Sequence, residues 1–209
     1  MKQEIRHVFF DIGGVLATNG WDRESRRLAV EKFGLDAEGF GSQHDALAGP
    51  LDEGTVTLSE YVKFAVFNEP RSFTETDFID FIYAQSVPHQ ETIDIARAVA
   101  AGCTYWVMTL NNESDELNRY RIEKFGLDEI FDAFLSSCWL GLRKPTAAFY
   151  KRALDIAQAC PATSVFIDDR EQNIIPAKNL GMNVILYQSA SQLKTELHQL
   201  GIKFNLQDS

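Results

Sequence analysis

The stretch FFDIGGVL, residues 9–16, decides how the rest of the chain is interpreted. It completes a short apolar run from His7, which is typical of a strand buried in a parallel sheet. Asp11 follows the run directly, and a carboxylate there is costly unless it has a partner or a function. Gly13 and Gly14 let the backbone turn tightly and approach a ligand. The stretch predicts a ligand site at the carboxyl end of the first strand; an aspartate that only caps the next turn is the alternative.

Further apolar runs and helical patterns predict the rest of a parallel sheet. The predicted strands cover about 6–11, 104–110, 134–136, 164–167 and 183–187, and the helices between them cover 90–101, 114–125, 146–158 and 171–180. Strands that alternate with helices indicate an α/β fold with right-handed crossovers. Pro145 is expected to stand at the start of its helix, a position that proline favours.

The alternation stops between about residues 19 and 88, where only helical patterns are found. The segments 23–33, 58–67 and 75–85 are the candidates. Because this interval is much longer than a normal crossover, it predicts a helical cap domain (19–88) inserted into a core made of 1–18 and 89–209. Helices that simply cover one face of the sheet are the alternative. We expect most of the cap's aromatic residues to form its own core: Phe40, Tyr61, Phe64, Phe67, Phe73, Phe78, Phe81 and Tyr83.

Two adjacent acids, Asp168 and Asp169, end the fourth predicted strand. Neighbouring carboxylates repel each other and favour a cation. Magnesium uses few protein carboxylates, so Asp11 and one member of this pair would be enough to hold it. The alternative is that the pair caps the helix at 171–180, although one cap needs only one acid.

Amide and lysine side chains follow two further elements. Asn111 and Asn112 come after the second strand, and amide groups at the start of a helix bind anions. A turn with a helix cap is the alternative there. Lys144 precedes the helix at 146–158, where its charge opposes the helix dipole unless an anion is bound. All these groups lie at one edge of the sheet and together suit transfer through an aspartyl intermediate.

The order of these motifs resembles the haloacid dehalogenase (HAD) superfamily over about residues 6–188. The matching positions are Asp11, Asn111-Asn112, Lys144, Asp168-Asp169, Asn173 and Gly181-Met182, and the position of the helical insert resembles subfamily I with a C1-type cap. The resemblance implies a Rossmann-like sheet of order 3-2-1-4-5. It also implies a Mg²⁺-dependent phosphatase that acts on a small phosphate monoester through an aspartyl-phosphate intermediate.

The resemblance also implies a role for each matching residue. Asp11 would be the nucleophile and a Mg²⁺ ligand, with the Gly13 carbonyl and Asp169 as further ligands and Asp168 orienting metal-bound water. Lys144 would neutralise Asp11 and the transferring group. The phosphate would be held by Asn111, the amide of Asn112 and the loop at Gly13 and Gly14, and Asn173 would support the acidic pair.

Two positions depart from the family pattern. Gly13 stands where phosphatases of this family usually have a second aspartate, the general acid and base, whose contribution is about 10²–10⁴-fold. A substitute from the cap is expected, with His44 or Asp45 as candidates. Asn111 replaces the usual serine or threonine. The alternatives are a 2-haloacid dehalogenase that also uses Asp11, and a catalytically weakened binding or regulatory protein.

The overall composition narrows the partners. The chain of 209 residues has 30 acidic and 20 basic residues, a net charge of -10. This balance argues against nucleic acid or an anionic membrane as a partner, and it requires local positive charge for a phosphate. No apolar stretch is long enough for a membrane span. Three separated cysteines are expected to be free thiols in the cytoplasm. The oligomeric state is not predicted.

Overall fold

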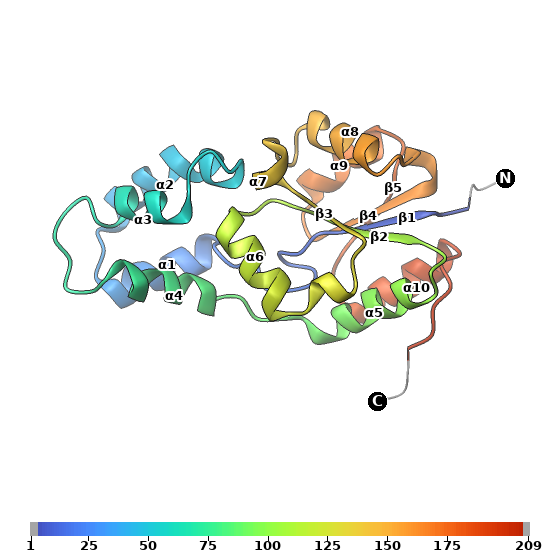
Figure 1. Cartoon of the computed structure of the whole chain (residues 1–209), viewed down its shortest axis with the longest axis horizontal. Helices are drawn as coiled ribbons and strands as arrows, with labels where there is room; N and C mark the ends of the chain where they lie inside the picture. The colour runs from blue at the N-terminus through green and yellow to red at the C-terminus, as the bar shows by residue number, and fades with distance from the viewer. Residues whose placement is uncertain (1–3, 207–209) are drawn as a thin grey trace.

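A parallel sheet forms the centre of the molecule (Figure 1). The computed structural model describes residues 4–206, so the first three and last three residues of the predicted core lie outside the described residues. The strands are β1 (His7–Phe10), β2 (Trp106–Asn111), β3 (Ala133–Ser136), β4 (Ser164–Asp168) and β5 (Asn183–Leu186). Their order is β3-β2-β1-β4-β5 and each neighbouring pair is parallel. This confirms the predicted α/β class and the predicted strand order.

Helices cover both faces of the sheet (Figure 1). They are α5 (Gln90–Ala101), α6 (Asp115–Lys124), α7 (Ser137–Leu140), α8 (Ala147–Ile156), α9 (Glu171–Asn179) and α10 (Ala190–Gln199), with short 3-10 turns η1 (Leu127–Glu129) and η2 (Pro161–Thr163). Side chains alternate across a strand. Val8 and Phe10 therefore pack under α5 and α10, while Phe9 packs under α8 and α9. Because β1 is buried on both faces, it has the continuous apolar run seen in the sequence.

The long interval after β1 folds into helices that pack on one another. They are α1 (Arg23–Phe33), α2 (Ala37–Asp52), α3 (Leu58–Ala65) and α4 (Glu75–Ala84), called the four-helix unit below. Phe40, Tyr61 and Phe78 are buried in its own hydrophobic cluster, as expected of cap aromatics, whereas Phe64 is 46% exposed. The unit lies to one side of the sheet (Figure 1).

The chain enters and leaves the four-helix unit at one place. The Thr18 amide donates to the Val87 carbonyl at 2.9 Å, and the His89 amide donates to the Leu16 carbonyl at 2.8 Å. The two connections therefore run side by side. The limits predicted at 18/19 and 88/89 lie at these connections, and the division into a core and a cap domain stays a prediction.

Three helices and one helix start differ from the sequence predictions. The helices α2, α7 and α10 were not predicted; α2 contains three glycines and Pro50, residues that disfavour helices. Pro145 does not begin α8, because Thr146 is the N-cap and the helix starts at Ala147. The segment before α8 is instead fixed by Asn112, whose side chain accepts from the Lys144 amide at 2.9 Å and donates to the Lys144 carbonyl at 3.0 Å. In the described part of the chain, no helix combines the length and apolar character that crossing a membrane requires.

Candidate active site

The ends of neighbouring strands bring the predicted site residues together. Asp11 follows β1, and Asp168 is the last residue of β4, the strand paired with β1. Lys144 reaches them from the segment before α8. Its Nζ lies 2.9 Å from Asp11 Oδ1 and 2.7 Å from Asp168 Oδ2. The structure thus groups two acids and one lysine from three distant parts of the chain.

The ionisation of Asp11 depends on the cations around it. Asp11 is 6% exposed, and burial raises its pKa to about 8, with Asp168 adding repulsion and the Lys144 ammonium opposing the rise. Burial disfavours the charge of Lys144, but the two carboxylates outweigh this effect and raise its pKa. The Asp11 carboxylate is thus under-compensated, and a further cation nearby would favour its ionised, nucleophilic form.

The oxygens of Asp11 have different environments. Oδ1 accepts from the Ile12 amide at 2.8 Å as well as contacting Lys144. Both contacts fall on Oδ1, so this is the oxygen that the protein holds in place.

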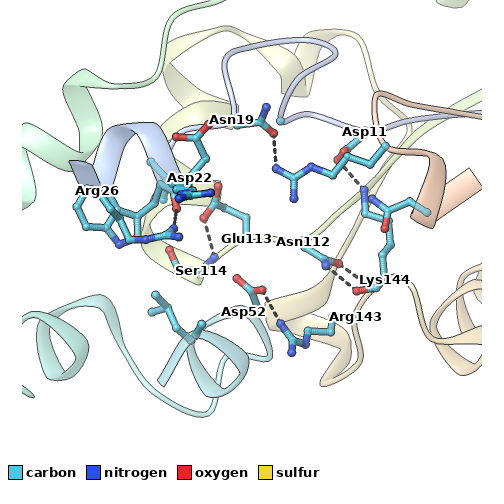
Figure 2. A pocket seen from close by; sticks show the side chains of 18 of the residues that line it. Asp11, Asn19, Asp22, Arg26, Asp52, Asn112, Glu113, Ser114, Arg143 and Lys144 are labelled. Carbon is cyan, nitrogen blue, oxygen red and sulfur yellow. Dashed lines mark hydrogen bonds and ion pairs between the residues drawn. The ribbon is translucent and has the colours of Figure 1, made fainter. Parts of the chain in front are cut away.

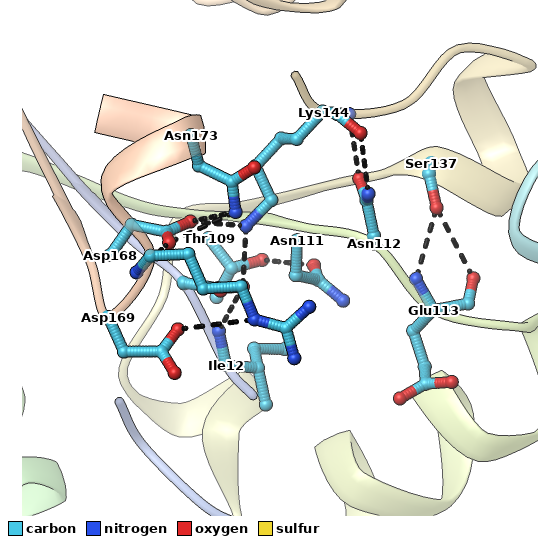
Figure 3. Close-up of polar contacts among 12 residues, drawn as sticks. Ile12, Thr109, Asn111, Asn112, Glu113, Ser137, Lys144, Asp168, Asp169 and Asn173 are labelled. Atoms are coloured by element: carbon cyan, nitrogen blue, oxygen red, sulfur yellow. Dashed lines mark hydrogen bonds and ion pairs between the residues drawn. The ribbon is translucent and has the colours of Figure 1, made fainter. Parts of the chain in front are cut away.

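Protein donors hold both oxygens of Asp168 (Figure 3). Oδ1 accepts from the Arg170 amide at 2.8 Å, and the Asn173 side-chain amide lies 3.0 Å from each oxygen. Oδ2 also receives the Lys144 ammonium. Asp168 is fully buried and its lone pairs are satisfied within the protein. This arrangement suits a group that positions Lys144 better than one that binds a ligand directly.

Asp169 has the opposite character. Its Oδ1 is buried without a hydrogen-bond partner in the described structure, and Arg170 Nε lies 4.0 Å away. Oxygens of Asp11, Asp168 and Asp169 lie within 4.8 Å of one another. A buried, unsatisfied carboxylate oxygen beside two other acids fits a hard divalent cation. The donor set therefore can hold a metal ion, with Asp169 offering the open oxygen.

Gly14 makes this approach possible. Its φ is +79°, and a Cβ built on it would lie 2.3 Å from Asp169 Oδ2. A side chain here would be strained by the backbone and would displace Asp169. The second glycine of the FFDIGGVL stretch thus keeps space for the acid that follows β4.

Asn111 does not take the orientation expected of a phosphate ligand. It is 1% exposed, its amide donates to Asn118 Oδ1 at 2.9 Å, and its oxygen accepts from Ser136 Oγ at 2.9 Å. A buried side chain gains most by satisfying its own polar groups, and these partners were not visible from the local sequence. The Asn111 side chain is committed to this network, unlike the prediction, whereas Asn112 lines the cavity.

A cavity of about 660 Å³ opens over these groups, between the sheet edge and the four-helix unit. Asp11 and Lys144 line one part of it, and Arg26 and Asp52 line another (Figure 2); Gly13 also belongs to its wall. Such a volume suits a small organic ligand.

The two expected substitutes for the missing aspartate lie in different places. Asp45 is exposed and is not part of the cavity wall. His44 lines the cavity, but its Nδ1 is 3.0 Å from the Tyr61 hydroxyl, and burial together with the charge of Arg26 lowers its pKa to about 4. At neutral pH this imidazole is in its neutral form, which is a poor general acid.

Asp52 at the end of α2 was missed because α2 was not predicted. It lines the cavity, and Figure 2 shows its carboxyl group between Glu113 and Arg143. Arg143 Nη1 lies 3.2 Å from Asp52 Oδ2. Burial raises the pKa of Asp52 against the opposing effect of Arg143. A raised pKa is what a carboxyl group needs to act as an acid near neutral pH.

Arg121 on α6 is a second residue that was not recognised. It is 1% exposed, and its Nε donates to Ser86 Oγ while Nη2 donates to the Thr18 carbonyl, both at 3.0 Å. Nη1 lies 3.1 Å from Glu113 Oε2. Arg121 thus ties both connections of the four-helix unit to the core. Its signal in the sequence was its position on the apolar face of the predicted helix.

The sequence of residues 5–181 matches the model of haloacid dehalogenase-like hydrolases. The chain belongs to this hydrolase family. Membership agrees with the strand order and with the acids at the ends of β1 and β4. It identifies the protein as a HAD-like enzyme.

Individual relatives extend the comparison. Bifunctional epoxide hydrolase 2 of Sus scrofa is 27% identical over 94% of this chain, and the chain spans 39% of that protein's length. Sesquiterpene phosphatase astK of Aspergillus oryzae is 29% identical over 47% of the chain and 50% of its own. The HAD family enzyme bt-2542 of Bacteroides thetaiotaomicron, solved with magnesium and inorganic phosphate, has a TM-score of 0.74 at 20% identity, covering 88% of this chain and 95% of its own. The last likeness shows the shared fold.

Proposed function

We propose that this HAD-like hydrolase is a Mg²⁺-dependent phosphatase that acts on small phosphate monoesters through an aspartyl-phosphate on Asp11. The observation that carries the proposal is the pairing of Asp11 with Lys144 beside the unsatisfied Oδ1 of Asp169. This combination offers a nucleophile, a fixed positive charge and a cation site at one end of a cavity. The relatives that are named as a phosphatase or were solved with magnesium and phosphate support the same chemistry.

Each residue of the site would have its own role in phosphoryl transfer. Asp11, the Gly13 carbonyl and Asp169 would hold Mg²⁺, which when bound supplies charge neutralisation for the phosphoryl group. Asp11 attacks phosphorus and the bond to the ester oxygen breaks. Lys144 stabilises the negative charge on the transferring group, and Asp168 and Asn173 hold Lys144 in place. The amides of Gly13 and Asn112 would bind phosphoryl oxygens, because the Gly14 amide already donates to the Ala17 carbonyl at 2.7 Å.

Asp52 is our candidate for the acid–base role that Gly13 leaves open. In its protonated form it would give its proton to the leaving oxygen. As a carboxylate it would then take a proton from the water that attacks the phosphorus of the aspartyl-phosphate, releasing phosphate and regenerating Asp11. Its place on the cavity wall and its raised pKa support this assignment over His44.

The four-helix unit would serve as a cap. It supplies Arg26, His44 and Asp52 to the cavity wall, while the sheet edge supplies Asp11 and Lys144. A wall divided in this way can admit substrate when the two parts separate and exclude water when they meet.

The test is release of inorganic phosphate from a panel of phosphate monoesters, with Mg²⁺ and with a chelator. Halide release from 2-haloacids is measured in parallel. We expect phosphate release that requires Mg²⁺. Halide release that persists in the chelator would favour the dehalogenase alternative. Tight binding of phosphate analogues without any turnover would indicate a binding protein and contradict the proposal.

A further inference from the structure

The part of the cavity that lies in the four-helix unit contains an arginine, Arg26, that forms no ion pair with the acids of residues 4–206. Arg26 is on α1 and lines the cavity together with Trp21 and His44. Figure 2 shows Arg26 on the opposite side of the pocket from Asp11 and Lys144. A ligand that reaches from the nucleophile into the four-helix unit would meet this guanidinium.

Three other arginines of the wall are each matched to a carboxylate: Arg121 is buried, Arg143 is half-buried and Arg170 is exposed. The pairs are Arg121 with Glu113 (3.1 Å), Arg143 with Asp52 (3.2 Å) and Arg170 with Asp169 (4.0 Å). Within residues 4–206 Arg26 has no carboxylate at ion-pair distance, and its guanidinium donates from Nη1 to the Trp21 carbonyl at 2.8 Å. Arg23, the remaining arginine of the wall, is exposed to solvent. Arg26 is thus a half-buried cation with donors to spare.

The neighbours of Arg26 do not supply the missing negative charge. His44 is neutral near pH 7, because burial and the charge of Arg26 itself lower its pKa to about 4. Asp22 also lines the cavity, but its Oδ1 accepts from the Ser25 amide at 2.9 Å as the cap of α1. Neither residue therefore forms an ion pair with Arg26 within residues 4–206.

Apolar side chains line the same cavity. Leu51, Leu58 and Ile82 belong to its wall and come from three helices of the four-helix unit or their ends. A carbon skeleton would be accommodated against them, whereas a charged chain would lose solvation there.

We propose that Arg26 binds a second anionic group, a carboxylate or a second phosphate, at the far end of the substrate's leaving group. The substrate class is then a phosphate monoester whose short carbon skeleton ends in another anion. This inference rests on the proposed phosphatase function. An arginine suits the task because its planar fork donates two parallel hydrogen bonds to carboxylate or phosphate oxygens.

The test compares matched substrates: the phosphate ester of a short ω-hydroxy acid, the methyl ester of that compound, and the bisphosphate of the corresponding diol. The readout is the ratio of kcat/KM for each charged substrate to kcat/KM for the methyl ester. For at least one charged substrate we expect a wild-type ratio of about ten or more, the size expected of a hydrogen bond between charged groups. The difference should come mainly from a lower KM for the charged substrate than for the methyl ester. Which charged substrate gains identifies the anion.

Variants separate recognition from structure. Arg26→Gln should bring the ratio to within about threefold of one, and Arg26→Lys should give an intermediate value because it keeps the charge without the fork. Arg27→Gln is the matched control on the same helix, because Arg27 is exposed and paired with Glu24 and Glu31. It should keep the wild-type ratio. A ratio near one in the wild type, or a ratio unchanged in Arg26→Gln, would overturn the proposal and leave Arg26 only its contact with Trp21.

A binding measurement keeps this test distinct from the test of the proposed function. Calorimetric titration of the charged compound and its methyl ester into the Asp11→Asn protein with Mg²⁺ requires no turnover. We expect tighter binding of the charged compound, lost when Arg26→Gln is added. Failure of hydrolysis with this binding difference intact would reject the phosphatase and retain the anion site. Equal binding of the two compounds would reject the anion site.

Discussion

The ammonium of Lys144 lies 2.9 Å from Oδ1 of Asp11, in an environment where both side chains are almost completely buried. The contact fixes the carboxylate and supplies one positive charge. A second carboxylate, Asp168, shares that charge at 2.7 Å, so one lysine serves two acids. The site is therefore short of positive charge, which is the physical basis for a cation and for an anionic substrate held by it.

Removing Lys144 should impair both catalysis and stability. In Lys144→Ala the two acids lose their shared cation, and we expect kcat/KM to fall by at least about 10²-fold, as for loss of a donor to a charged transition state. The melting temperature without Mg²⁺ should also fall. Lys151→Ala, an exposed lysine of α8, is the control. Wild-type kcat/KM in Lys144→Ala would remove this residue from the mechanism.

Asp169 should determine Mg²⁺ affinity. Because its Oδ1 is buried without a partner, Asp169→Asn should weaken Mg²⁺ binding by at least about tenfold, and the rise in melting temperature that Mg²⁺ gives the wild type should shrink accordingly. Calorimetry and thermal melts measure both effects. Asp155→Asn, an exposed acid on α8, should behave as the wild type. Unchanged affinity in Asp169→Asn would show that another oxygen set holds the ion.

Asp52 should matter most when the leaving group is poor. If it protonates the leaving oxygen, Asp52→Asn should lower kcat for alkyl phosphates by about 10²–10⁴-fold, while p-nitrophenyl phosphate, whose leaving group needs little protonation, should lose far less. Asp45→Asn is the matched control, because Asp45 lies in the same helix but is exposed. An equal loss on both substrates would assign Asp52 a structural role through Arg143.

His44 gives a pH-dependent contribution to stability. Its pKa in the folded chain, about 4, lies below the ordinary value of 6.5. As pH falls below about 6.5, the unfolded chain takes up a proton that the folded chain does not, so the free energy of unfolding falls until about pH 4. In His44→Asn this loss is absent. Melts at several pH values should show the wild type losing stability relative to the variant across this window; a constant difference would refute the assignment.

The fold was predictable from the sequence wherever a local pattern of apolar residues was enough to identify a strand or helix. β1 and β4 are buried on both faces, so their apolar runs are continuous and end at the acids of the site. By contrast α2 is held by the Asp36 cap and by burial of Phe40 and Leu51, which outweigh its glycines and Pro50. Tertiary contacts of this kind override local propensity and are not visible in a sequence window.

The sequence predicted correctly those site residues whose place follows from the end of a strand. Asp11 and Asp168 meet because the parallel strands β1 and β4 end at the same edge, and Lys144 reaches them from the segment before α8. Asn111 differs because its partners, Asn118 and Ser136, come from other elements. Arg26 lies among ordinary charged residues of an amphipathic helix, and its lack of a partner becomes visible only in three dimensions.

The central claim is that Asp11 forms a covalent bond to phosphorus. The most direct measurement is to mix the protein with Mg²⁺ and a phosphate monoester, quench rapidly in acid, and analyse by mass spectrometry the peptide that contains Asp11. We predict that this peptide gains the mass of one phosphoryl group during turnover and that the label is absent in Asp11→Asn, which should also release no phosphate. Phosphate release by Asp11→Asn at the wild-type rate would contradict the account.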